Sequence, residues 1–118
     1  MSTKAITIED YLVDQDGSQD FTSPVYDLRH PLLSMNWQMK WEAGVTGFFI
    51  WEASIFSDPK VWETLVACEE VKLNIETAPG SGIVSLPNQW LTAGFIRFRF
   101  VAAGGSGLIQ VAMRVVPT

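Results

Sequence analysis

Strict alternation of apolar and polar side chains along two stretches of the chain constrains its fold more than any other feature. In the segment MNWQMKW, residues 35–41, the odd positions are apolar and the even positions polar. Residues 95–102 repeat the pattern, with Arg97 and Arg99 on one side and Ile96, Phe98 and Phe100 on the other. Successive side chains of a strand point to opposite faces, so this period is typical of a strand with one buried face.

Glycine-rich segments follow both stretches. The segment AGVTG separates a strand predicted at 34–41 from one at 48–55, and GGSG separates 95–102 from another alternating stretch at 108–116. Glycine is favoured in tight turns because it tolerates positive φ. We therefore predict two β-hairpins.

Shorter alternating runs predict further strands at 5–8, 25–28, 72–76 and 83–86. The one helical competitor is 57–65, where Asp58 is placed to cap a helix and Pro59 to occupy its first position. Many short strands with glycine-rich turns predict an all-β fold. We expect a two-sheet antiparallel β-sandwich, jelly-roll-like, with about seven to eight strands and at most one short helical turn.

The 118 residues correspond to a single domain. Within it we distinguish residues 1–24, an N-terminal strand or arm with a polar loop that orders against a neighbour, from the β-sandwich domain at 25–118. Hydrophobic residues make up 47% of the chain and include five tryptophans and seven phenylalanines. Such an aromatic content serves either a core or a buried interface.

The net charge of −5 argues against a sequence-independent grip on nucleic acid, which needs clustered lysines and arginines, and against binding to an anionic membrane surface. We expect neither nucleic acid nor membrane among the partners. The single cysteine, Cys68, excludes an internal disulfide. The N-terminal segment lacks the apolar stretch of a signal peptide, so we expect a chain that is not secreted by that route.

Three aspartates, Asp14, Asp16 and Asp20, are candidate calcium ligands, because a hard cation prefers oxygen ligands at alternating positions. The spacing departs from an EF-hand loop: Gly17 comes two places early, and Val25 stands where the twelfth-position glutamate belongs. A solvated loop accounts for these residues more simply.

No arrangement in the sequence supports catalysis. His30 is the single histidine, so zinc would lack companions, and Cys68 lies in an apolar run typical of a core thiol. Glu69 and Glu70 are adjacent, and adjacent strand residues point to opposite faces rather than forming an acid–base pair. We expect no cofactor and no enzymatic activity.

Three segments occur in an informative order: SQDFTSPVYDLRH (18–30), WQMKWEAGVTGFFIWEASIFSDPKVWETL (37–65) and WLTAGFIRFRFVAAGGSGLIQVAMRVV (90–116). Together they resemble a family of small β-sandwich virion proteins of tailed bacteriophages. The family's pattern is a Ser…Asp-Leu entry, a Trp-Gly turn, a strand ending in Ser, a Trp-x-x-Leu and an aromatic–Arg strand closed by a glycine-rich turn. The stretched turn at 41–44 and the presence of Pro59 depart from that pattern.

The resemblance implies a role in assembly rather than chemistry. It implies a capsid decoration (cement) protein or a tail- or fibre-associated protein, present in the virion after assembly in the host cytoplasm. It also implies a symmetric homo-oligomer, with a trimer favoured, and binding to the major capsid or tail protein. It carries over no catalytic residues.

The residues suggest where such contacts lie. If Phe49, Trp51 and Ala53 face inward, Phe48 and Ile50 face outward and contribute to an apolar patch that a monomer usually avoids. Alternatively, this strand is central and covered on both faces.

Arg97 and Arg99 are suited to bidentate pairing with the carboxylates of a neighbour. The alternative is a salt bridge within the monomer, which contributes only ~0–1 kcal/mol at a surface.

A carbohydrate-binding module that uses exposed tryptophans is the alternative function. It requires a solvent-facing row formed from the five tryptophans, Trp37, Trp41, Trp51, Trp62 and Trp90, whereas an assembly protein buries most of them. Trp37 and Trp41 share the parity of Met35 and Met39, which favours the core.

Overall fold

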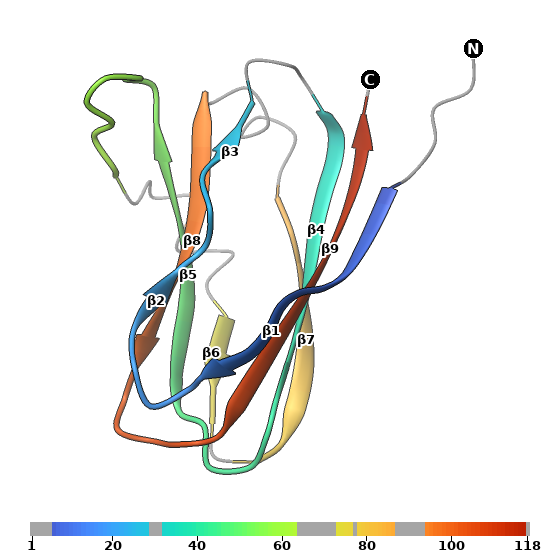
Figure 1. Cartoon of the computed structure of the whole chain (residues 1–118), viewed down its shortest axis with the longest axis vertical. Helices are drawn as coiled ribbons and strands as arrows, with labels where there is room; N and C mark the ends of the chain where they lie inside the picture. Colours follow the sequence, from blue (N-terminus) through green and yellow to red (C-terminus); the bar gives the residue numbers. More distant parts are fainter. Residues whose placement is uncertain (1–5, 29–31, 64–72, 77, 87–93, 118) are drawn as a thin grey trace.

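The computed structural model describes residues 6–28, 32–63, 73–76, 78–86 and 94–117. They form two antiparallel sheets packed face to face (Figure 1), and the part of the chain so described contains no helix. The predicted all-β sandwich is confirmed.

In order across the sheet, the four-stranded sheet consists of β1 (Ile6–Asp16), β9 (Leu108–Pro117), β4 (Leu32–Trp41) and β7 (Gly80–Ser85). The five-stranded sheet consists of β2 (Phe21–Thr22), β8 (Phe95–Ala102), β5 (Gly47–Ser54) and β6 (Leu73–Ile75), with β3 (Tyr26–Asp27) also paired to β8.

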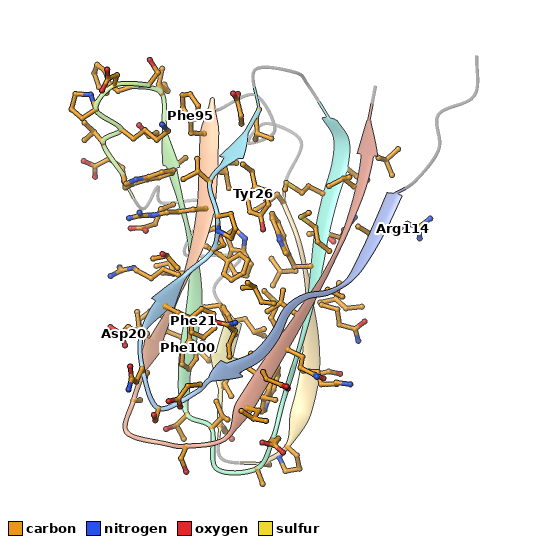
Figure 2. All side chains as sticks on the ribbon, in the orientation of Figure 1. Asp20, Phe21, Tyr26, Phe95, Phe100 and Arg114 are labelled. Carbon is orange, nitrogen blue, oxygen red and sulfur yellow. The ribbon has the colours of Figure 1, made fainter. Side chains whose placement is uncertain are left out.

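The core lies between the sheets and follows the parity of the sequence. Each of the four interior strands, β4, β9, β5 and β8, contributes every second side chain to it, so that water is excluded from a layer of aromatic and aliphatic groups. In Figure 2, Phe21, Tyr26 and Phe100 point into this layer. The strands supply Met35, Trp37, Met39, Ile109, Val111, Met113, Phe49, Trp51, Ala53, Ile96, Phe98 and Phe100.

Both predicted hairpins are wrong. β4 and β5 belong to different sheets, and so do β8 and β9, so residues 42–46 and 103–107 cross from one sheet to the other. Alternation determines which side chains face the core but not which strand lies alongside. Each connection is long enough to span the ~10 Å between packed sheets. Val45, within the first connection, is completely buried and closes the end of the core.

The crossing loops meet at the lower end of the sandwich in Figure 1 and hydrogen-bond to one another. Gly17 N donates to Gly107 O at 2.8 Å, and Ser106 N donates to Gly44 O at 3.0 Å. The side chains of Asp20 and Glu42 accept from the backbone N–H groups of Ala102 and Leu108, both at 2.8 Å. Three loops from distant parts of the sequence therefore hold the two sheets together at this end.

The N-terminal part of the described chain is built into the sheet. β1 pairs with β9 from Ile6↔Val115 to Asp16↔Leu108, with irregularities between Ile8 and Gln15. The strand therefore extends to Asp16, into the stretch of calcium candidates for which the sequence predicted a solvated loop. Asp14 itself adopts a positive φ of 54° in this irregular part of the strand.

The helical turn predicted from residue 57 does not form over the described residues, which end at Glu63. This loop is held instead by the Ser54 hydroxyl, which accepts from Val61 N and donates to Phe56 O, both at 2.9 Å. Ala53 and Glu63 then exchange backbone hydrogen bonds at 3.1 and 3.0 Å. These contacts hold the loop after β5 in a conformation other than the predicted helical turn.

Candidate functional site

The outer face of the five-stranded sheet carries the predicted interface residues. On β5 and β8 the outward side chains are paired across the strands, Glu52 with Arg97 and Ile50 with Arg99. Opposite neighbours on one face of an antiparallel pair lie close enough for their side chains to contact. The structure thus brings Ile50, Arg97 and Arg99 together, and Phe48 lies one pair further along, opposite Val101.

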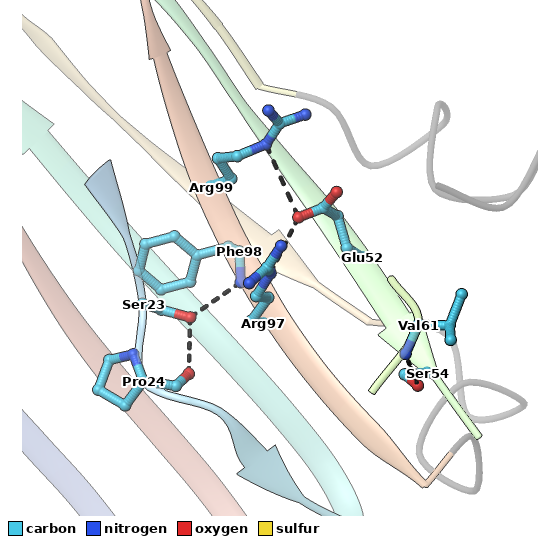
Figure 3. Close-up of polar contacts among 8 residues, drawn as sticks. All are labelled: Ser23, Pro24, Glu52, Ser54, Val61, Arg97, Phe98 and Arg99. Carbon is cyan, nitrogen blue, oxygen red and sulfur yellow. Dashed lines mark hydrogen bonds and ion pairs between the residues drawn. The ribbon is translucent and has the colours of Figure 1, made fainter. Parts of the chain in front are cut away.

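Glu52 is the centre of this face, and the sequence analysis did not identify it. Its carboxylate Oε1 lies 3.0 Å from Arg97 Nε and 3.7 Å from Arg99 Nε, as Figure 3 shows. Glu52 is only 7% exposed although it points away from the core. One buried carboxylate therefore faces two guanidinium groups, which gives the cluster a net positive charge on an acidic chain. The monomer salt bridge expected as an alternative is formed.

Arg99 is incompletely satisfied. Its Nε is buried and, within the described part of the chain, has no hydrogen-bond partner. Its side chain is nevertheless 41% exposed, so the rest of the guanidinium group is accessible from solvent. Guanidinium groups present several donors in a rigid plane that fits a carboxylate. The exposed part of the Arg99 guanidinium group is therefore open to a further contact.

The loop after β5 folds toward this face. The Trp62 ring lies under Arg97, with the guanidinium carbon 4.3 Å from the ring centroid, and Lys60 Nζ lies 4.6 Å from the centroid of Phe95. Cations are attracted to the faces of aromatic rings. These two contacts position the loop beside the Glu52 cluster, and neither was predicted because their partners are far apart in the sequence.

Ile50 does not form the exposed patch predicted for it. It is 6% exposed, because β5 is an interior strand between β8 and β6 and has Arg99 directly opposite. Phe48 is half-buried. The alternative, a central strand covered on both faces, describes Ile50 correctly.

Three exposed apolar side chains lie instead on the loop that follows β5. Ile55 is 84% exposed, Phe56 67% and Val61 47%. Large apolar groups gathered on one loop mark a contact surface more often than isolated ones do. We call this set, together with Arg97 and Arg99, the loop face.

The tryptophans do not form a solvent-facing row among the described residues. Trp37 and Trp51 are buried in the core, at 1% and 0% exposure. Trp41 is half-buried and donates from Nε1 to Ala78 O at 2.9 Å, and Trp62 is covered by Arg97. Trp90 lies outside the described residues.

The calcium candidates do not converge. Asp16 Oδ1 accepts from the backbone N–H and the hydroxyl of Ser18, at 2.9 and 2.7 Å, and these bonds lower the pKa of Asp16. Asp20 Oδ1 accepts a hydrogen bond from Ala102 N, and Asp14 Oδ1 accepts one from Gln110 Nε2 at 3.5 Å. In the ranges that the structure covers, no three His, Cys, Asp or Glu side chains gather as a metal site would require. His30, Cys68, Glu69 and Glu70 lie outside the described residues.

Solved structures with the same fold include phage-derived proteins. The PBSX exported protein XepA aligns with 98% of this chain and 37% of its own at a TM-score of 0.55 and 17% identity. The SPBc2 prophage-derived protein YomS aligns with 98% of this chain and 96% of its own, at a TM-score of 0.50 and 10% identity. The VP2 subviral particle of infectious bursal disease virus aligns with 98% of this chain, at a TM-score of 0.53 and 13% identity.

These similarities establish the fold and nothing finer, because the identities are low. The chain spans 37% of the XepA chain and 32% of the VP2 chain, but almost the whole of YomS. No family model matches the sequence, and no curated protein matches it. None of the described segments is a helix long and apolar enough to cross a bilayer.

Proposed function

We propose that the chain is a non-enzymatic structural protein of a bacteriophage particle, either a capsid decoration protein or a tail- or fibre-associated one. The observation that carries this proposal is the near end-to-end similarity of the sandwich to a prophage-derived protein of the same size. The order of segments that resembles phage virion proteins supports it independently.

The loop face is the contact surface in this proposal. Its apolar part, Ile55 and Phe56, is suited to burial against a partner, and the exposed part of the Arg99 guanidinium group is suited to a partner's carboxylate. The partners are further copies of the chain, with a trimer favoured, and a major capsid or tail protein. In such an interface the apolar side chains supply buried area and the charged groups supply specificity.

Two equally exposed side chains, one on the loop after β5 and one on the four-stranded sheet, provide a matched test of the loop face. Phe56→Asp should abolish self-association in sedimentation velocity and release the chain from gradient-purified particles under a mild salt wash. Ile83→Asp, at 68% exposure on the four-stranded sheet, should do neither. If the two variants behave alike, or if the wild-type chain is monomeric and absent from particles, the proposal fails.

A further inference from the structure

A hollow of about 390 Å³ lies at the end of the four-stranded sheet where the crossing loops meet. Leu108, the first residue of β9, lines it and is 41% exposed. The hollow combines an apolar part with a charged part, which come respectively from Trp41, Pro79 and Leu108 and from Asp14, Lys40 and Glu42. It therefore offers apolar area and carboxylates side by side, as the contact surface of a protein does.

Two of these carboxylates are held in place by bonds within the chain. Glu42 Oε1 accepts from Leu108 N at 2.8 Å, and Asp14 Oδ1 accepts from Gln110 Nε2 at 3.5 Å. Each of these bonds uses one oxygen, whereas a carboxylate accepts several hydrogen bonds. Asp14 and Glu42 are therefore positioned and can still accept from an incoming donor.

Asp16 adds a third negative charge beside the hollow. It lies opposite Leu108 in the pairing of β1 with β9. Its bonds from the hydroxyl and backbone N–H of Ser18 lower the pKa of Asp16, so its carboxylate is ionised at neutral pH. Among the described residues around Leu108, three carboxylates thus oppose one cation, Lys40, and this end of the sandwich is acidic.

The loop face has the complementary composition. Its exposed apolar side chains include Ile55 and Phe56, and part of the Arg99 guanidinium group is accessible beside them on the same face. The described part of the chain contains five lysines and arginines, and three of them, Lys60, Arg97 and Arg99, lie on this loop or on the sheet face that it covers. An apolar and cationic surface is thus available to meet an apolar and acidic one.

Neither surface carries charges of one sign alone. Asp58 and Glu63 lie on the loop that carries the loop face, and Lys40 lines the hollow. The loop carboxylates disfavour a uniform polyanion as the partner of the loop face. Mixed charges of this kind select a partner surface with a matching pattern.

The hollow and the loop face lie at opposite ends of the sandwich. In Figure 1 the loop after β5 is at the upper end and the crossing loops are at the lower end. One chain therefore cannot place its own loop in its own hollow, whereas a second copy can. Two loop faces packed on each other would instead bring the same cations together, which is unfavourable.

We propose that the loop face of one copy docks into the hollow of the next copy. Phe56 packs against Leu108, and Arg99 lies beside the carboxylates at the hollow. This inference rests on the proposed function, because it specifies which second surface the loop face contacts when copies associate. A contact between two different surfaces is heterologous, and it generates a ring, such as the favoured trimer, when the rotation between copies closes.

Sedimentation velocity of a Leu108→Lys variant tests the hollow. The added cation faces the cations of the incoming loop face, so self-association should weaken at least about tenfold. Ile83→Lys is the matched control, because Ile83 is an exposed apolar residue of the same sheet outside this hollow and should leave association unchanged. Circular dichroism spectra like that of the wild type exclude unfolding in both variants.

A mixture of two defective variants distinguishes a head-to-tail contact from a face-to-face one. Phe56→Asp keeps an intact hollow, and Leu108→Lys keeps an intact loop face. Each alone should be monomeric, but together they should form a complex with equal amounts of the two chains through the one intact pair of surfaces.

The inference is overturned if Leu108→Lys associates like the wild type or if the mixture stays monomeric. Both results can occur while Phe56→Asp abolishes association, and the proposed function then stands without this inference. A wild-type chain that is monomeric overturns both. A complex in the mixture supports the head-to-tail contact whether or not the chain resides in particles, because the experiment uses the purified chain alone.

Discussion

The indole rings of Trp37 on β4 and Trp51 on β5 lie 5.6 Å apart, at an interplanar angle of 53°, and join the two sheets through the centre of the core. The ring of Phe98 contacts both, at 6.2 and 5.8 Å. Tilted and edge-to-face aromatic pairs of this kind contribute beyond the area that they bury. The tryptophans that seemed available for a ligand are thus the main link between the sheets.

Truncation of a central tryptophan should be among the most damaging single changes in the chain. Trp51→Ala should lower the free energy of unfolding by about 3–5 kcal/mol, because it leaves a large cavity between the sheets. Trp62→Ala removes a half-buried ring and one cation–π contact, and should cost about 1–2 kcal/mol. Urea denaturation followed by circular dichroism measures both, and equal losses would argue against the core position of Trp51.

Removal of the Glu52 carboxylate should destabilise the fold although it lies on an outer face. Glu52→Ala leaves Arg97 and Arg99 beside each other without a counter-charge, and we expect a loss of about 2–4 kcal/mol in the free energy of unfolding. Glu76→Ala, at an exposed glutamate, should change it by less than about 0.5 kcal/mol. The same denaturation experiment compares them, and a neutral Glu52→Ala would mean that the cluster is a solvated surface pair.

The stability of the hydrogen-bonded loops at the end of the sandwich should depend on which of two adjacent glycines gains a methyl group. A Cβ on Gly105 would overlap the backbone at Gly44 O and Thr46 N, whereas Gly104 has open space around it and only a positive φ of 87° to penalise a side chain. We expect Gly105→Ala to lower the free energy of unfolding by about 2 kcal/mol or more and Gly104→Ala by about 1 kcal/mol. Thermal unfolding should therefore show the larger decrease in Tm for Gly105→Ala.

The Asp16 carboxylate should respond to the loss of a single hydroxyl. Ser18 lowers the pKa of Asp16 through its hydroxyl and its backbone N–H, so Ser18→Ala should raise that pKa toward the usual value for aspartate. A pKa lowered by folding stabilises the folded state above the usual pKa, and this contribution is lost as the pH falls through the folded-state pKa. Carboxyl NMR titration of both chains measures the shift, and an unchanged pKa would contradict the assigned cause.

The burial pattern of the long strands was predictable because a two-residue period directly specifies which side chains face inward. Trp37 and Phe98 are buried as that pattern requires, and Arg97 and Arg99 point outward. Strand partners were not predictable in the same way. A glycine-rich loop serves a hairpin or a crossing between sheets equally well, and Val45, the residue that closes the core in such a crossing, is an ordinary valine in the sequence.

The candidate site was predictable only in part. Arg97 and Arg99 stand out because charged residues interrupt an otherwise apolar strand. Glu52 does not, because its burial depends on Arg97, 45 residues away, and on a loop that returns to the same face.

The copy number of the chain in purified particles tests the central claim most directly. Phage particles induced from a strain that carries the gene for this chain are gradient-purified, digested and quantified by mass spectrometry against isotope-labelled peptides of this chain and of the major capsid protein. We predict a fixed ratio that survives repeated purification, comparable to the capsid protein for a decoration protein and a small fraction of it for a tail or fibre component. A chain that is abundant in the lysate but absent from the particles would contradict the account.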